Sequence, residues 1–361
     1  MKILVTGAKG FVGSNLIARL TFLGHEVLSF DKENDYDDLV NFIYQADFVF
    51  HLAGVNRPTD NKDFNQNYSL TNDLITAEKK TGIHLPIVFT SSTQALLDND
   101  YGKSKKEAED LLLNSNLPVY VCRCPNLFGK WCRPNYNSVV ATFCYNVAHN
   151  IEINVNKDAN PISFLYIDDL IDLFIDILDG KVNQGLITEF KNTYRATPKE
   201  IADLVLSFKG SRKDYTIPFQ AGFVKKLYAT YLTYLDGSDF SYDVIPHTDD
   251  RGSFIELYKT PGFGQTSINV IKPGITKGNH YHHTKNEKFI VVSGECEIKQ
   301  RKIGTTDTIS IKTNGNCVKI VDIIPGFTHN ITNIGNTDAV VIMWSSELFD
   351  PEHPDTYFEE V

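Results

Sequence analysis

The first thirteen residues constrain the fold of this chain more than any other stretch. Residues 2–5, Lys-Ile-Leu-Val, form a short apolar run typical of a strand buried on both faces. Glycines follow at positions 7, 10 and 13, and apolar residues then recur at helical spacing from Phe11 to Leu20. A strand, a glycine turn and a helix in this order present bare helix N–H groups to a pyrophosphate. The flanking strand and helix favour a dinucleotide site over a glycine turn that only caps a helix.

Composition limits the partners and the setting of the protein. Its 361 residues allow two or three domains, and a formal net charge of -10 argues against a nucleic-acid surface. The start is a strand and no apolar run approaches a membrane span, so we expect no signal peptide and no membrane association. The cysteines are scattered without a C-x-x-C pair, which favours reduced thiols and a cytoplasmic location.

Strand-like and helix-like patterns alternate after the glycine turn. Apolar runs at 27–30, 48–52, 85–90 and 119–123 predict further strands, and residues 103–113 have the pattern of a helix. This alternation predicts an α/β fold with a doubly wound parallel sheet. Asp31 and Lys32 follow the second strand, where an acidic residue binds a ribose 2′-hydroxyl and a basic one accommodates a 2′-phosphate. The adjacent pair leaves NADH and NADPH both open.

Five segments together resemble the extended short-chain dehydrogenase/reductases, which act largely on nucleotide sugars. They are Thr6–Gly13, His51–Gly54, Ser91-Ser92, Tyr101–Lys105 and Arg123–Gly129, and they span most of residues 1–200. The resemblance implies a Rossmann domain with an NAD(P) site formed by Gly7, Lys9, Gly10, Phe11, Val12, Asp31, Lys32, Leu52, Ala53, Gly54, Tyr101 and Lys105. It also implies that Arg123 and Asn126 bind the substrate.

Tyr101 and Lys105 are the candidate catalytic pair, because i,i+4 spacing on a helix puts both side chains on one face. A free tyrosine, with a pKa of about 10, is a poor acid-base near neutrality. A neighbouring ammonium is expected to lower that pKa. The resemblance places the serine that holds the substrate carbonyl at Ser92, with Ser91 and Thr93 as other choices. An exposed tyrosine on a charged helix is the alternative, which the glycine turn and the serine pair disfavour.

Three later segments carry weaker predictions. Asp168 and Asp169 precede an apolar helix and could be either caps or ligands. Residues 197–200, Thr-Pro-Lys-Glu, predict a helix start, and 219–234 predicts a last helix rich in tyrosine.

The remainder of the chain changes character. Short apolar runs separated by Gly, Pro and Asn extend from 255 to 343 and predict an all-β sandwich or barrel. Within it lie Gly274-x5-His280-x-His282-x4-Glu287-x6-Gly294 and Gly326-x2-His329-x3-Asn333. These segments resemble the two motifs of the cupins, although Pro325 directly precedes Gly326, where that family usually leaves one residue between. We therefore predict a reductase domain over 1–243 and a cupin domain over 244–361.

The cupin motifs carry a candidate metal site. Alternate residues of a strand share a face, so His280 and His282 are expected to point into the barrel, joined by Glu287 and His329 from other strands. Three imidazoles and a carboxylate suit a divalent ion such as Zn, Fe, Mn, Co or Ni, and Zn is the expected one. The alternative is a polar barrel lining without metal, as in cupins that are sugar-nucleotide epimerases. Tyr281 and His283 alternate outward, and His283 is assigned to the substrate.

A reductase followed by a cupin is the arrangement of a family of bifunctional capsule-synthesis enzymes, and residues 125–132, 272–280 and 349–351 resemble that family. This resemblance implies a homodimer acting on a UDP-sugar, on the path to UDP-N-acetyl-L-fucosamine. The cupin would epimerise C3 of a UDP-2-acetamido-2,6-dideoxy-4-hexulose. The front domain would reduce C4 with NADPH to UDP-2-acetamido-2,6-dideoxy-β-L-talose. A plain reductase with a dimerising cupin and a cofactor-bound sensor are the alternatives.

Overall fold

The computed structural model describes residues 1–58, 60–156, 158–218 and 221–361, which fold into two compact units. The first unit comprises Met1–Leu206 and Gly222–Leu235, and the second comprises Ser207–Ala221 and Asp236–Val361. The two units therefore interleave along the sequence. The predicted boundary between a reductase domain ending at residue 243 and a cupin domain starting at residue 244 stays a prediction.

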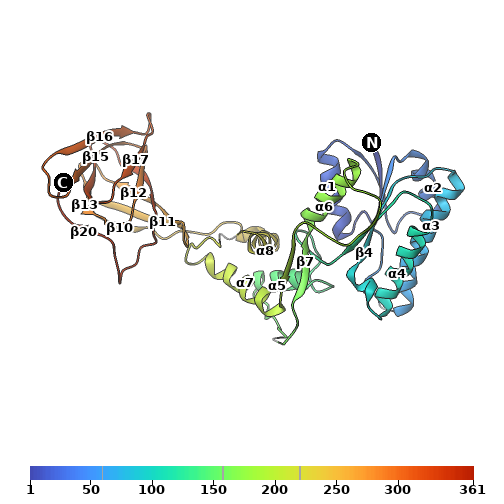
Figure 1. The fold of residues 1–361 in the computed structure, drawn as a ribbon. Helices are drawn as coiled ribbons and strands as arrows, with labels where there is room; N and C mark the ends of the chain where they lie inside the picture. The colour runs from blue at the N-terminus through green and yellow to red at the C-terminus, as the bar shows by residue number, and fades with distance from the viewer. Residues whose placement is uncertain (59, 157, 219–220) are drawn as a thin grey trace. The chain divides into compact units, whose positions relative to one another are not determined.

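The first unit is built on a parallel sheet with strand order β2-β1-β3-β4-β5-β8. Helices α1 and α6 cover one face, and α2, α3 and α4 cover the other (Figure 1). The predicted doubly wound sheet is thus confirmed. Its elements are β1 Lys2–Thr6, α1 Phe11–Phe22, β2 Glu26–Phe30, α2 Tyr36–Gln45, β3 Phe48–His51, α3 Asn65–Thr81, β4 Ile87–Ser92, α4 Asp100–Leu113, β5 Val119–Cys124, α6 Ile167–Leu178 and β8 Gly185–Ile187.

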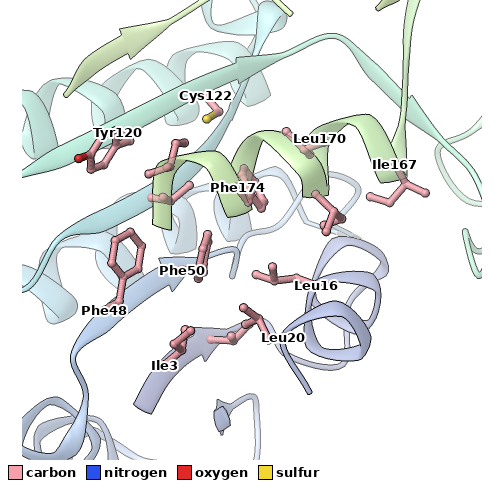
Figure 2. Packing of buried hydrophobic residues seen from close by; sticks show 14 of the residues in the cluster. Ile3, Leu16, Leu20, Phe48, Phe50, Tyr120, Cys122, Ile167, Leu170 and Phe174 are labelled. Carbon is pink, nitrogen blue, oxygen red and sulfur yellow. The ribbon is translucent and has the colours of Figure 1, made fainter. Parts of the chain in front are cut away.

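Two apolar cores explain why the strands lack the alternation of half-buried strands. Figure 2 shows the core between the sheet and helices α1 and α6, where the Phe50 and Phe174 rings lie 5.3 Å apart. Leu4 and Val49 belong to the core on the opposite face. The strand order reverses between the neighbouring strands β1 and β3. Ligands of such sheets bind outside the carboxyl ends of the strands at the point of reversal.

A smaller sheet, β6-β7-β9, and three further helices complete the first unit and lead into the second. Their bounds are β6 Asn126–Phe128, α5 Val139–Ala148, β7 Ile162–Tyr166, β9 Thr193–Ala196, α7 Pro198–Ser211 and α8 Phe223–Leu232. The predicted helix at 219–234 thus begins at Phe223, and residues 219–220 lie outside the described ranges.

The capping role considered for Asp168 and Asp169 is wrong. Helix α6 begins at Ile167 with Tyr166 in the N-cap position, so both aspartates lie inside its first turn. Their carboxylates instead form ion pairs, Asp168 with Lys130 at 2.5 Å and Asp169 with Lys226 at 2.5 Å.

The second unit consists of two antiparallel sheets that enclose an apolar core, as a cupin-like barrel does. The strand orders are β10-β11-β12-β19-β14-β17 and β16-β15-β18-β13-β20. The strands are β10 His247–Asp249, β11 Gly252–Thr260, β12 Gly264–Ile271, β13 Thr276–Tyr281, β14 Glu287–Ser293, β15 Glu295–Lys302, β16 Thr308–Asn314, β17 Ile320–Ile323, β18 Phe327–Asn333, β19 Ala339–Ser345 and β20 Tyr357–Phe358. The predicted all-β barrel is confirmed.

Across the described ranges, every helix is too short or too polar to cross a membrane.

Candidate functional site

The glycine turn between β1 and α1 needs glycine for two physical reasons. Gly7 has φ +68°, and a Cβ there would lie 2.8 Å from the backbone nitrogen of Ala53, two residues after β3 ends. A Cβ on Gly13 would lie 2.3 Å from the Gly7 carbonyl oxygen. The turn therefore packs against β3, and Gly10, at the N-cap, has no side chain to cover the first N–H groups of α1. The N-terminus of α1 faces a cavity.

This cavity has a volume of about 470 Å³ and lies at the carboxyl ends of the parallel strands. Most of the residues predicted to bind cofactor or to react line it, namely Gly7, Lys9, Gly10, Phe11, Val12, Leu52, Gly54, Ser92, Tyr101, Lys105 and Asn126. Among the described residues Ala53, Asp31, Lys32 and Arg123 are not part of its lining. A nicotinamide and a sugar carbonyl can meet in one such cavity.

The start of α4 is held by two contacts that bring Tyr101 to Ser92. The Asn99 side chain accepts a hydrogen bond from the Gly102 N–H at 2.8 Å, which caps the helix. Gly102 packs so tightly against the turn Thr93–Leu96 that a Cβ would lie 2.2 Å from the Gln94 carbonyl oxygen. Ser92 is the last residue of β4 and caps that turn by accepting a hydrogen bond from the Gln94 N–H at 3.2 Å.

The pKa of the Tyr101 hydroxyl is raised, whereas its neighbour Lys105 led us to expect a lowered one. Burial raises the pKa of Tyr101 to about 12, although the neighbouring Ser92 hydroxyl acts in the other direction. The Lys105 ammonium donates instead to the Thr90 carbonyl oxygen at 3.0 Å and lies 4.8 Å from the centre of the Phe89 ring. The phenol therefore stays protonated near neutrality, which suits a proton donor.

Lys105 is buried beside Asn67, a residue that the sequence analysis missed. Burial lowers the pKa of Lys105 to about 8. A Cβ on Gly54 would approach both the Lys105 ammonium, at 3.0 Å, and the Asn67 side-chain oxygen, at 2.9 Å. The Asn67 amide donates to the Ser104 hydroxyl at 2.9 Å and accepts from the Val55 N–H at 2.8 Å. The only sign of Asn67 in the sequence is a polar residue at a position of α3 that faces inward.

Arg123 has a different role from the predicted contact with substrate. Its guanidinium forms two hydrogen bonds with the Glu109 carboxylate, one of them 3.0 Å long, and both side chains are buried. Asn126, by contrast, lines the cavity. Arg133 and Tyr136, which were not predicted, also line it, with the guanidinium 5.3 Å from the ring centre.

The four predicted metal ligands converge in the second unit. One ligand atom from each of His280, His282, Glu287 and His329 lies within 4.8 Å of the others. A Glu287 carboxylate oxygen lies 3.3 Å from His282 Nε2 and 3.6 Å from His329 Nε2. These distances exceed those of good N–H···O hydrogen bonds. Within the described part of the chain these three atoms have no hydrogen-bond partner although they are buried.

The electrostatics of this cluster also fit a cation. Burial lowers the pKa of His280 to about 4, helped by the neighbouring His329 and His282, so this imidazole offers a free lone pair near neutrality. Burial acts to raise the pKa of Glu287, but His282 and His329 hold that pKa below its ordinary value. Buried polar atoms without partners are costly, and a divalent ion would satisfy all four residues at once.

A second cavity, of about 310 Å³, reaches the metal candidate through Glu287. It is lined by Phe254, Glu256, Gln265, Ser267, Lys285, Glu287, Met343, Ser345, Glu347 and Phe349. Its polar members other than Glu287 were not predicted, although Gln265 and Ser267 alternate along β12 as inward residues do. His283 is exposed, as predicted for an outward residue, and packs against the Tyr281 and Tyr357 rings.

Comparison with known proteins decides the family. Residues 3–186 match the NAD dependent epimerase/dehydratase family, and residues 247–357 match the polysaccharide biosynthesis C-terminal domain. The chain belongs to the NAD dependent epimerase/dehydratase family. The cofactor site of this family member is thus an NAD(P) site.

Similar proteins extend the match over the whole chain. A Pseudomonas aeruginosa protein named UDP-2-acetamido-2,6-beta-L-arabino-hexul-4-ose reductase is 45% identical over 99% of this chain and 98% of its own length. The crystal structure of the capsular polysaccharide assembling protein CapF from Staphylococcus aureus is 46% identical, covers 100% of both chains and has a TM-score of 0.92. A second crystal form of the S. aureus protein is 43% identical, covers 100% of both chains and has a TM-score of 0.83. This member of the family is therefore CapF-like along its full length.

Proposed function

We propose that the protein is a bifunctional nucleotide-sugar enzyme. The second unit epimerises C3 of a UDP-2-acetamido-2,6-dideoxy-4-hexulose, and the first unit reduces C4 with NADPH to UDP-2-acetamido-2,6-dideoxy-β-L-talose. The observation that carries the proposal is the presence of two separate chemical sets, Ser92, Tyr101 and Lys105 in one cavity and the His/Glu cluster in a barrel. The name of the P. aeruginosa relative supports a 4-keto sugar as the substrate.

The reduction uses groups that line the first cavity. Bound NADPH would supply the hydride that reduces the C4 carbonyl of the sugar. Tyr101 gives its hydroxyl proton to the carbonyl oxygen, which suits a phenol whose pKa is about 12. Ser92 holds the same oxygen, and Lys105 orients the cofactor and supports return of the proton to Tyr101. Asn67 helps to hold this arrangement through its bond to Ser104.

The epimerisation uses the acidity of the same ketone. A carbonyl at C4 acidifies the proton at C3, so a base can remove it and the resulting enolate can take a proton on the opposite face. His280, His282, Glu287 and His329 would hold a divalent ion, Zn in our proposal, and the ion would supply polarisation of the ketone. The cavity beside Glu287 offers room for the sugar. One keto intermediate then serves both units.

An NMR experiment in deuterated water tests the proposal on the full-length chain. Metal-loaded protein and the UDP-4-keto substrate without nicotinamide cofactor should give deuterium at C3, because deprotonation needs no hydride. Adding NADPH should give the reduced sugar. His280→Ala and Glu287→Gln should lower both bound metal and exchange, whereas Tyr101→Phe should leave exchange intact.

The same experiment distinguishes the bifunctional enzyme from the alternative, a reductase whose cupin has no catalytic role. In a plain reductase with a dimerising cupin, metal-loaded protein reduces the ketone but incorporates no deuterium at C3. Loss of exchange in Tyr101→Phe would move the epimerisation to the first unit. Either result contradicts the two-site proposal.

We also propose that the protein is a homodimer. Val318, Ile320 and Ile324 are exposed on or beside β17, and β17 is an edge strand of its sheet. Apolar edge strands favour pairing with another chain. Light scattering after size exclusion should give twice the mass of 40.7 kDa, and Ile320→Lys should reduce it toward the single-chain value.

A further inference from the structure

The C-terminal segment of the second unit runs alongside the strand that carries His280. Strand β20 pairs with β13, with Phe358 opposite His280 and Tyr357 opposite Tyr281. Glu359 donates its N–H to the Asn279 carbonyl oxygen at 3.0 Å and accepts from Arg301 at 2.9 Å. Residues 355–359 are called the C-terminal strap below. These contacts fix the strap beside the metal candidate.

The strap contacts one of the four clustered residues directly. The backbone carbonyl oxygen of Asp355 lies 2.5 Å from Nδ1 of His282. An oxygen at this position requires the proton on Nδ1, which leaves the lone pair on Nε2. Nε2 is the His282 atom that lies 3.3 Å from Glu287. The Asp355 carbonyl therefore selects the tautomer of His282 that can hold a metal.

The Asp355 side chain fixes the position of that carbonyl. Its carboxylate accepts hydrogen bonds from the backbone N–H groups of His283 at 2.9 Å, Thr284 at 2.8 Å and Lys285 at 2.8 Å. Three successive N–H groups around one carboxylate form an anion-binding concavity. The turn that follows His282 is thus held by the same residue that orients its imidazole.

The strap also holds a charged residue of the second cavity. Lys285 lines the cavity with Glu287, and its ammonium donates to the Thr356 hydroxyl at 3.0 Å. A strand that only covered the edge of the barrel would need the pairing of β20 with β13. It would not need the side-chain contacts of Asp355 and Thr356 with residues 283–285.

We propose that Asp355 is a positioning residue for the metal site of the second unit, acting through the tautomer and orientation of His282. The proposal rests on the proposed metal site and adds to it a residue outside the four ligands. Loss of the Asp355 carboxylate should weaken metal affinity by roughly 10- to 100-fold, the usual effect of removing an outer-shell partner. It should leave the first unit unaffected.

The test uses the full-length protein stripped of metal and titrated with Co²⁺ against a competing chelator. Asp355→Ala should show the weakened affinity and an altered d–d absorption of bound Co²⁺, which reports ligand arrangement. Asp355→Asn keeps the size and one acceptor oxygen, so its affinity should fall between wild type and Asp355→Ala. Asp350→Ala is the matched control, because Asp350 is an exposed aspartate of the same tail that bonds only to Glu352 and His353 among described residues.

Amide hydrogen exchange of the metal-free protein supplies a reading that needs no ion. Residues 283–285 should exchange faster in Asp355→Ala than in wild type, while β14 and β19 keep their protection and show that the barrel is folded. Equal Co²⁺ affinity and spectrum in wild type and folded Asp355→Ala overturn the positioning role. A wild-type chain that takes up no Co²⁺ overturns the metal site itself, and the positioning role with it.

Discussion

The backbone N–H of Lys9 donates to the Asp31 carboxylate at 2.7 Å and so ties the glycine turn to the end of β2. The same carboxylate accepts from the Lys32 N–H at 2.9 Å. Asp31 is therefore held by two backbone donors, and the Lys9 ammonium, which pairs with Glu33 at 2.7 Å, lies close by. The corner between the glycine turn and the end of β2 thus combines a held carboxylate with two lysines.

We expect the wild-type protein to prefer NADPH. Lys32→Ala should lower kcat/KM for NADPH by roughly tenfold, the effect of losing one hydrogen bond to a charged group, and leave the value for NADH within about twofold. Lys106→Ala, which removes an exposed lysine from α4, is the control. Steady-state kinetics with both cofactors measure the effect. A large wild-type preference for NADH would show that Asp31 repels the 2′-phosphate.

Tyr101→Phe should reduce NADPH oxidation with the keto sugar by roughly 10²- to 10⁴-fold, because the ketone oxygen loses its proton donor. The fold should persist, since only one hydroxyl is removed. Tyr44→Phe removes a hydroxyl from an exposed tyrosine of α2 and should retain full activity. Turnover of the Tyr101 variant at the wild-type rate would contradict the assignment.

The pH dependence of reduction should report Lys105. Its pKa is lowered to about 8, so the ammonium is charged below that pH and loses its proton above it. We expect kcat/KM for NADPH to fall about tenfold per unit as pH rises above 8, because this ratio reports groups of the free enzyme. Lys105→Arg stays charged and should lose this decline, even at lower overall activity. A wild-type profile that is flat to pH 9.5 would show that the charge is not needed.

Glu109→Ala should destabilise the first unit by about 3–5 kcal/mol, because it leaves the buried Arg123 guanidinium without its partner. Asp110→Ala breaks the exposed pair with Lys106 on the same helix and should change stability by less than about 1 kcal/mol. Urea unfolding, monitored by amide hydrogen exchange in β5, measures the free energy of unfolding of both variants. Similar midpoints for the two would mean that the buried pair contributes no more than the exposed one.

Sequence patterns predicted those features of the fold that depend on residues close together in the chain. The run at residues 2–5 and the glycines after it predicted β1, the turn and α1, since strand burial and backbone freedom depend on neighbouring residues. The histidine spacing likewise predicted the convergence of His280 and His282. Residues two apart in a strand point to the same face, so the spacing of the two histidines is enough to predict that their side chains lie together.

Contacts between distant segments were not predictable in this way. Arg123 begins the segment 123–129 that resembles the family, yet its buried partner Glu109 lies on α4. The sequence alone does not show whether the guanidinium binds this carboxylate or a substrate. The lowered pKa expected for Tyr101 failed for a similar reason, because burial in the cavity wall raises the pKa of its hydroxyl. Asp355 reaches His282 across more than seventy residues of sequence.

The interleaving of the two units has a consequence for how such genes recombine. Within the second unit, the Ile217 N–H donates to the Lys259 carbonyl oxygen and the Lys259 N–H to the Tyr215 carbonyl oxygen, each at 2.7 Å, so a segment that precedes α8 pairs with β11. A single crossover after α8 would deliver a barrel from one parent and its pairing segment from the other. We expect functional chimeras to take residues 207–221 and 236–361 from the same parent, so that the pairing within the second unit is preserved.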